Sequence, residues 1–243
     1  MYKVVNIEPG RPARPGQLII QRRLILASSL FLGQDKGRTL LDLGCGNGAQ
    51  TLLFTPHFER VIGVDLLPLN RAENPVPSGS FDFLRGEAAR LPLRSESIDS
   101  AISFEVLEHT PDDELALKEV HRVLRKSGIF LFTVPNKWWI FESHGASVPL
   151  FNWIPWNRIP FVGWLPRAIH ERFARARTYT MRRARRLATQ SGFAVVASGY
   201  ITAPLDVLPD GSMRRVLRAS LFKKETTGIP LLAVNLYVYC RKV

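Results

Sequence analysis

The chain has 243 residues, of which 46% are hydrophobic and 22% charged, an ordinary globular balance that excludes disordered and fibrous classes. This length predicts one domain with an elaboration. Lys and Arg exceed Asp and Glu by 12 (33 against 21), which favours anionic partners such as nucleic acid, anionic lipid headgroups or phosphorylated substrates.

The first 32 residues predict neither a secretory signal nor a spanning helix. Residues 1–16 contain three prolines and two arginines and have no apolar core. The apolar stretch of residues 18–32 is interrupted by Gln21, Arg22 and Arg23, whereas a spanning helix needs about 20 apolar residues in a row. The two cysteines, Cys45 and Cys240, form no disulfide framework, so we expect a cytoplasmic protein.

From residue 39 to residue 135, short apolar runs alternate with polar, helix-like stretches. The runs predict five strands, at residues 39–43, 60–64, 80–84, 97–104 and 128–134. Residues 112–126 are predicted to form a helix, because apolar residues recur there at helical spacing and Gly128 follows. Strands that alternate with helices predict right-handed βαβ units and a parallel sheet.

The pattern changes after Pro135. Residues 136–169 are rich in tryptophan and proline, so they cannot form one long helix. A helix is predicted from Thr178 to Gln190, with Gly192 as its terminator. The remaining predictions are a second amphipathic helix within residues 206–224, a turn at 222–230, and strands at 193–202 and 231–242.

The strongest local signal is a glycine-rich loop directly after the first strand. It reads Leu40-Leu41-Asp42-Leu43-Gly44-Cys45-Gly46-Asn47-Gly48, and a helix is predicted from about Ala49. Glycines let the backbone turn tightly and let a ligand approach the main chain, and ligands of open α/β sheets bind at the carboxyl ends of strands. The spacing also satisfies the dinucleotide pattern G-x-G-x-x-G/A, so glycines alone leave the ligand open.

Two acidic residues narrow the choice of ligand. Asp65 ends the second strand, 17 residues past Gly48, where its carboxylate can accept hydrogen bonds from both hydroxyls of a ribose. Asp42 lies beneath the loop, where a carboxylate would repel a pyrophosphate but suit an ammonium group. An adenosyl amino acid is therefore favoured over NAD, with a purely structural glycine turn as the alternative.

With these motifs the chain resembles the small-molecule class I S-adenosylmethionine-dependent methyltransferases over roughly residues 38–135. The resemblance implies a Rossmann-like, seven-stranded, mostly parallel sheet flanked by helices, and S-adenosyl-L-methionine as cofactor. In that family the loop holds the methionine moiety, the acid matching Asp65 holds the ribose, and the position of Glu87, where Asp is more usual, meets the adenine. The implied cofactor-binding residues are Asp42, Gly44, Cys45, Gly46, Gly48, Asp65, Leu66, Glu87, Ala88 and Phe104.

The residues after the fourth strand predict the acceptor chemistry. Methyl transfer to a hydroxyl needs the acceptor held in line and a base to remove its proton, and His109 is the candidate catalytic base. A substrate contact or a structural turn is the alternative role for His109. Glu105, Glu108 and His109 also resemble the metal-binding residues of quinone-biosynthesis O-methyltransferases, so metal binding stays open and no metal ligand is assigned. No Asn-Pro-Pro-Tyr-like sequence follows the strand, which disfavours amino methylation of adenine or glutamine and favours an oxygen or carbon acceptor.

Residues 136–177 are expected to form an insert over the active-site edge. Their aromatic residues and arginines fit a subdomain core, a cap over a hydrophobic acceptor, or a surface that meets anionic lipid. The aromatic and histidine residues are Trp138, Trp139, Phe141, His144, Phe151, Trp153, Trp156, Phe161 and Trp164. The arginines are Arg158, Arg167, Arg172, Arg175 and Arg177.

We therefore predict one methyltransferase domain over residues 1–243, with a cofactor-binding half (38–135), the insert (136–177) and the C-terminal half of the sheet (178–243). The predicted activity is S-adenosylmethionine-dependent methylation of a small-molecule or lipid-linked acceptor, at oxygen, with peripheral contact with an anionic membrane. The alternatives are an RNA methyltransferase, nucleic acid being the less favoured partner, and a cofactor-binding regulatory protein without turnover. The sequence predicts no oligomeric state.

Overall fold

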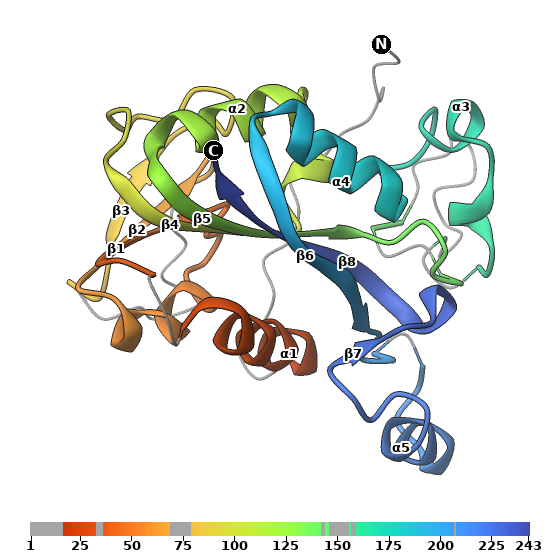
Figure 1. Ribbon diagram of the computed structural model, residues 1–243. Helices are drawn as coiled ribbons and strands as arrows, with labels where there is room; N and C mark the ends of the chain where they lie inside the picture. Colours follow the sequence, from red (N-terminus) through yellow and green to blue (C-terminus); the bar gives the residue numbers. More distant parts are fainter. Residues whose placement is uncertain are drawn as a thin grey trace.

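One mixed sheet organises the part of the chain that the computed structural model describes, namely residues 17–32, 36–68, 79–141, 144–145, 156, 159–206 and 208–243 (Figure 1). Its eight strands lie in the order β3-β2-β1-β4-β5-β8-β6-β7. The strands are β1 (Thr39–Leu43), β2 (Arg60–Asp65), β3 (Asp82–Arg85), β4 (Ile98–Phe104), β5 (Leu124–Pro135), β6 (Phe193–Thr202), β7 (Thr226–Thr227) and β8 (Ala233–Lys242).

The sheet is parallel from β3 to β5, and β8 runs antiparallel between β5 and β6. This arrangement confirms the Rossmann-like, mostly parallel fold. An eighth strand, the two-residue β7, pairs with the end of β6 in addition to the seven expected. The strands β1, β2, β4 and β5 therefore end at one edge, which we call the carboxyl edge, and β8 begins there.

Helices cover both faces of the sheet. In Figure 1, α2 (Asp113–Val123) and α4 (Met181–Gln190) lie on one face and α1 (Leu18–Ala27) on the other. Successive residues of β1 alternate between the two faces: Leu41 packs in the α2 and α4 core, and Leu40 in the core that includes Ala27 of α1. The other helical segments are η1 (Ser28–Leu32), η2 (Thr51–Leu53), η3 (Thr55–His57), η4 (Leu107–His109), η6 (Val162–Trp164), α3 (Arg167–His170), α5 (Ser212–Ala219) and η7 (Pro230–Leu232).

Helix α2 forms where its apolar spacing predicts it. The Asp112 carboxylate caps its start by accepting a hydrogen bond from the Leu115 N–H at 2.9 Å. Its apolar face is buried against the sheet. The helix ends at Val123 and not at residue 126, because Leu124 takes an extended conformation and pairs with β4 as the first residue of β5.

The helix predicted from Ala49 is wrong, and two 3₁₀ turns stand in its place. The turns η2 and η3 occupy residues 51–57, and Pro56 lies in the second of them. A proline has no N–H to donate and its ring clashes with the carbonyl four residues earlier, so a continuous α-helix cannot pass through Pro56. Thr180, and not Thr178, caps α4, with its Oγ1 accepting from the Arg183 N–H.

Candidate functional site

The glycine loop follows β1 in a conformation that only glycine adopts easily. Gly44, Gly46 and Gly48 have φ values of 76°, 53° and 76°. A Cβ atom on Gly44 would lie 2.1 Å from Cγ2 of Val106, so the loop packs against the segment that follows β4. The N–H groups of Gly44 and Cys45 both point to the Val64 carbonyl of β2, at 2.7 and 3.3 Å. The loop therefore forms a cradle at the carboxyl edge with no Cβ atom at three of its five residues, Gly44, Gly46 and Gly48.

Asp42 is buried beneath this loop. Its Oδ2 accepts a hydrogen bond from Thr51 Oγ1 at 2.6 Å. Burial raises the pKa of Asp42 to about 7, although the Thr51 hydroxyl favours the charged form. The carboxyl of Asp42 is thus poised to ionise when a cation lies close to it.

Asp65 joins the loop to the end of β2. Its Oδ2 accepts from the Gly46 N–H at 2.8 Å and its Oδ1 accepts from the Leu67 N–H at 3.0 Å. A carboxylate has about four acceptor positions, so each oxygen can still accept a second bond from a ribose hydroxyl. Leu66, the next residue, is exposed.

The other expected cofactor contacts lie around the same edge. The Gly86 N–H donates to the Asp65 carbonyl at 2.9 Å, which places the exposed Glu87 and the half-buried Ala88 beside the end of β2. Phe104 is buried at the end of β4, where it stacks on Phe54 with 6.3 Å between ring centroids. The Cys45 thiol is buried, and burial raises its pKa above the ordinary range, so it behaves as a packing residue.

The cradle fits an adenosyl amino acid better than a dinucleotide. A buried carboxyl under three glycines at positive φ offers an acceptor to an ammonium group, and a pyrophosphate would meet that charge at close range. The second carboxylate, on Asp65, faces the loop at the end of the adjacent strand. These side chains come from elements that the parallel register of β1 and β2 brings together.

A carboxylate–imidazole cluster, which we define as Glu105, Glu108, His109 and His144, lies directly after β4. Nε2 of His144 is 3.5 Å from Glu108 Oε1 and 3.7 Å from Glu105 Oε2, and Nε2 of His109 is 3.9 Å from Glu108 Oε1. The two imidazole rings meet edge to face, with their centroids 4.8 Å apart. Glu105 begins this turn at φ 60°, a left-handed conformation.

Glu108 is the most deeply buried member of the cluster. Its side chain is fully buried, and neither carboxylate oxygen accepts a hydrogen bond from another described residue. Burial, followed by the nearby charge of Glu105, raises the pKa of Glu108 well above its ordinary value. A carboxylate buried in this way is stable in its charged form only when a positive charge lies beside it, either an imidazolium or a bound cation.

A metal ion could bind within this cluster. The potential ligand atoms of Glu108, His109 and His144 all lie within 4.8 Å of one another. Glu108 and His109 were already considered as metal ligands from the sequence, and the structure adds His144 to them. Glu105 Oε1 instead accepts a hydrogen bond from Asn235 Nδ2 at 2.7 Å.

Arg23, His144 and Asn235 belong to the site but were not assigned to it from the sequence. Arg23, on α1, is buried with Nη2 3.9 Å from Glu105 Oε1, and its guanidinium lies over the Phe104 ring at 5.7 Å from the centroid. The neighbouring Arg22 donates to the carbonyls of Thr202 and Phe222. Two adjacent arginines in an otherwise apolar helix were the available signal, because such a helix packs on a core and its cations then need buried partners.

One arginine of the insert is a buried structural residue and not part of an exposed cationic surface. Arg177 is buried, its N–H donates to the Glu108 carbonyl at 3.2 Å, and its guanidinium donates to the carbonyls of Thr110 and Pro111. Nearby, the Tyr179 hydroxyl donates to Asp113 at 2.8 Å. These contacts brace the turn that carries Glu108 and His109. Residues Phe151, Trp153 and Arg158 of the insert, and residues 1–16, lie outside the described residues.

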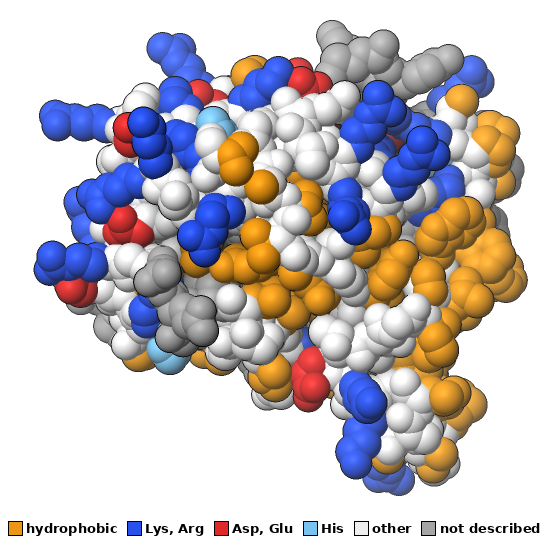
Figure 2. Space-filling view, viewed as in Figure 1, with side chains coloured by type: hydrophobic (Ala, Val, Ile, Leu, Met, Phe, Trp, Pro, Cys, Tyr) orange, Lys and Arg blue, Asp and Glu red, His pale blue; other side chains and the backbone are white. Residues whose placement is uncertain are grey.

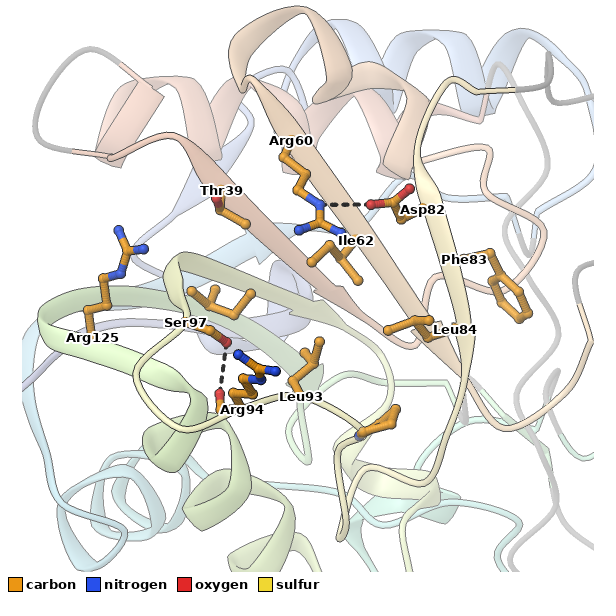
Figure 3. A pocket seen from close by; sticks show the side chains of 12 residues that line it. Thr39, Arg60, Ile62, Asp82, Phe83, Leu84, Leu93, Arg94, Ser97 and Arg125 are labelled. Atoms are coloured by element: carbon orange, nitrogen blue, oxygen red, sulfur yellow. Dashed lines mark hydrogen bonds and ion pairs between the residues drawn. The ribbon is translucent and has the colours of Figure 1, made fainter.

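A cavity of about 670 Å³ lies away from this site (Figure 3). Thr39, Arg60 and Asp82, which begin β1, β2 and β3, line it, so it opens at the amino ends of these strands. Ligands of such sheets bind at the opposite end. We therefore do not connect this cavity with the glycine loop.

Comparison with known proteins supports the methyltransferase class of the chain. Residues 41–132 match the family model of the methyltransferase domain. A Mycolicibacterium smegmatis protein named "Probable S-adenosylmethionine-dependent methyltransferase" is 37% identical over 114 residues, which are 47% of this chain and 44% of that protein. The ubiquinone/menaquinone biosynthesis C-methyltransferase of Rubrivivax gelatinosus is 32% identical over 171 residues, 67% of this chain and 61% of that protein.

A solved structure extends the likeness to nearly the whole chain. An S-adenosylmethionine-dependent methyltransferase from Mesorhizobium loti superposes with a TM-score of 0.60 at 22% identity, covering 92% of this chain and 98% of that one. The aligned segment spans less than half the length of the Mycolicibacterium smegmatis relative. The sheet order and the glycine loop define a Rossmann-like methyltransferase domain. Residues 41–132 carry the methyltransferase domain of that family model, and the chain has the fold of the class I S-adenosylmethionine-dependent methyltransferases.

Proposed function

We propose that this chain transfers a methyl group from S-adenosylmethionine to a hydroxyl of a small-molecule or lipid-linked acceptor, with His109 as the base. The observation that carries the proposal is the position of the carboxylate–imidazole cluster. Val106 contacts Gly44 of the glycine loop, and Glu108 and His109 follow Val106 in the next turn. A base at this point is adjacent to the cofactor cradle.

The chain's own residues then have separate roles in binding. S-adenosylmethionine, when bound, supplies an electrophilic methyl group on a sulfonium sulfur. The Asp42 carboxylate attracts the ammonium group of its amino-acid part, and the Asp65 carboxylate accepts from the ribose hydroxyls. Glu87, exposed beside Ala88, is placed to accept from the adenine amino group.

His109 removes the proton of the acceptor hydroxyl as the oxygen–carbon bond forms and the carbon–sulfur bond breaks. The buried Glu108 carboxylate, 3.9 Å from His109 Nε2, stabilises the imidazolium that results. Arg177 holds the turn in place through the carbonyls of Glu108 and Thr110, which fixes the backbone that carries His109.

Carbon is the second candidate acceptor atom. The Rubrivivax gelatinosus relative is named as a C-methyltransferase of ubiquinone and menaquinone biosynthesis, and it matches 67% of this chain. A base at His109 would serve an acidic carbon as well as a hydroxyl. The methylated atom is read from the carbon-13 chemical shift of the transferred methyl group.

We place the protein in the cytoplasm, with peripheral contact with the membrane as part of the proposal. No helix among the described residues has the length and apolarity to span a bilayer. A lipid-linked acceptor would then be met at the membrane surface.

The proposal is tested by offering labelled S-adenosylmethionine and separate lipid, small-molecule and RNA fractions to the purified chain. We expect label in the lipid or small-molecule fraction. His109→Gln should lower turnover by about 100-fold and leave cofactor affinity within about twofold of wild type. His57→Gln, which changes an exposed histidine in η3, is the matched control and should leave turnover unchanged.

Three results would contradict the proposal in different ways. Label found in RNA alone would favour the RNA methyltransferase. An unaltered rate in His109→Gln would make His109 a structural residue. Loss of activity on chelation, restored by a divalent ion, would replace the base by a metal site in the same cluster.

A further inference from the structure

Helix α5 presents an apolar face to solvent. Met213 and Val216 of α5, and Leu221 two residues after its end, are 62%, 64% and 64% exposed. Leu217 of the helix and the buried Phe222, which follows it, pack in a cluster with Trp139, Ala203 and Leu205. The helix is therefore anchored to the domain through Leu217 and Phe222 and leaves Met213, Val216 and Leu221 uncovered.

Basic residues accompany this exposed face. Residues 206–224 hold five Lys and Arg against two Asp. Arg214 and Arg218 pair with Asp210 and Asp206 beside the helix. Arg215, Lys223 and Lys224 are exposed. An apolar face beside exposed cations is the pattern of a helix that lies in a membrane interface.

The apolar surface continues beyond α5. Exposed side chains come from the segment before β8 (Ile229, Leu231) and from the insert (Trp138, Phe161, Trp164, Ile169). Figure 2 shows hydrophobic side chains along the flank of the molecule that runs from the region of α3 to α5. We call these six residues, together with Met213, Val216 and Leu221, the interfacial surface. Soluble proteins rarely expose so many large apolar side chains on one flank without a partner.

The interfacial surface belongs to the same edge of the sheet as the site. Trp138 follows the end of β5, α5 follows the end of β6, and Leu231 precedes the start of β8. The parallel and antiparallel registers put these three strand ends at the carboxyl edge, where Gly44 and His109 lie. A flat partner that covers the interfacial surface would therefore lie beside the opening of the site.

We propose that the interfacial surface docks on an anionic lipid bilayer, with α5 lying in the headgroup plane. Met213, Val216 and Leu221 enter the boundary of the acyl chains, while Arg215, Lys223 and Lys224 meet lipid phosphates. An acidic protein partner would meet the cations but would need a dedicated groove for the three apolar side chains of Met213, Val216 and Leu221. The docking itself does not depend on the proposed function. Its role does, because docking would bring a lipid-linked acceptor to His109.

The test is co-sedimentation of the full chain with vesicles, without cofactor or acceptor. We expect binding to phosphatidylcholine vesicles that contain phosphatidylserine, and much weaker binding to phosphatidylcholine alone. Val216→Glu should weaken binding by about tenfold, because it removes an inserted side chain and adds a charge of the same sign as the lipid. Val196→Glu on β6 is the matched control, with 58% exposure outside the interfacial surface, and should change binding by less than about twofold.

Several outcomes would overturn the inference. Wild-type protein that stays in the supernatant with anionic vesicles would do so. Equal losses in Val216→Glu and Val196→Glu would reduce the effect to net charge alone. A wild-type dimer that Val216→Glu converts to a monomer in light scattering would assign the surface to a second copy of the chain. Because the measurement needs no methyl transfer, its failure and the failure of the proposed reaction are distinguishable.

Discussion

The carboxyl group of Asp42 is buried and is also placed to bind a ligand cation. The sequence placed it at the end of the first strand, beneath the glycines, and the structure buries it there with one hydrogen bond from Thr51. Burial without a cation raises its pKa, and a bound ammonium group would lower it again. Ligand binding and ionisation of Asp42 are therefore coupled.

This coupling predicts a pH-dependent cofactor affinity. With a pKa of about 7, the Asp42 carboxyl is mostly neutral at pH 6 and mostly ionised at pH 7.5, so the affinity for S-adenosylhomocysteine should rise roughly tenfold over this interval. The ligand carries a free amino-acid ammonium group, which titrates above this interval and stays charged at both pH values. Calorimetry at both pH values measures the change.

Two variants separate Asp42 from other titrating groups. Asp42→Asn should bind weakly with nearly the same affinity at both pH values, whereas Asp82→Asn, an exposed carboxyl at the start of β3, should keep the wild-type slope. A slope that survives in Asp42→Asn would assign the pH dependence to another group.

Single residues of the site were predictable when their chemistry followed from strand ends. Asp42 is the last residue but one of β1 and Asp65 is the last of β2, so parallel pairing alone brings them to one edge. Arg23, His144 and Asn235 belong to segments far apart in the chain, and no local pattern connects them with Glu105. Their convergence is a consequence of packing α1 and β8 around the end of β4.

At the scale of elements, the strands were the most predictable part of the fold. The runs in β1 and β4 are buried on both faces and combine apolar residues with a few buried polar ones, such as Asp42, Ser100 and Ser103. Their observed bounds agree with the predicted ones to within a residue. The segment after the glycine loop was not predictable in the same way. The glycine-rich loop indicated a helix from about Ala49, but two short 3₁₀ turns stand there, with Pro56 in the second.

The packing of the glycine loop can be tested by comparing Gly44 with Gly79, a glycine of similar φ outside the loop. Gly44 and Gly79 have φ values of 76° and 80°, so alanine at either position meets the same backbone strain. A Cβ on Gly44 would overlap Val106, whereas one on Gly79 would meet nothing within 4 Å. Gly79→Ala should lower the free energy of unfolding by about 1 kcal/mol, and Gly44→Ala by about 2 kcal/mol more, from overpacking.

Urea denaturation measures both variants. Val106→Ala in the Gly44→Ala background should recover part of the loss, because it removes the methyl groups that the new Cβ meets. Equal destabilisation by Gly44→Ala and Gly79→Ala would show that the loop does not depend on its contact with Val106.

At the scale of the whole molecule, the net charge indicated that a partner would be anionic, but it did not indicate which surface of the protein binds that partner. Of the 33 Lys and Arg residues, Arg22, Arg23 and Arg177 are buried and serve the domain's own carbonyl and carboxylate groups. The cations beside α5 accompany exposed apolar side chains instead. Composition counts both kinds alike, and only the packing of the chain separates them.

The binding of a cofactor to the loop should stabilise the entire fold, because the cradle exists only when β1, β2 and the segment after β4 are assembled. At 100 times its dissociation constant, S-adenosylhomocysteine adds about 2.7 kcal/mol, which for a chain of this length corresponds to a Tm increase of roughly 5–10 °C. Asp65→Asn removes one charged acceptor of the ribose hydroxyls. If this lowers affinity tenfold, the same ligand concentration adds about 1.4 kcal/mol and the shift falls to roughly half. His57→Gln should keep the full shift in a calorimetric scan. An equal Tm increase with NAD in place of S-adenosylhomocysteine would contradict the selectivity that Asp42 gives the loop, since a pyrophosphate over that carboxyl should destabilise the complex.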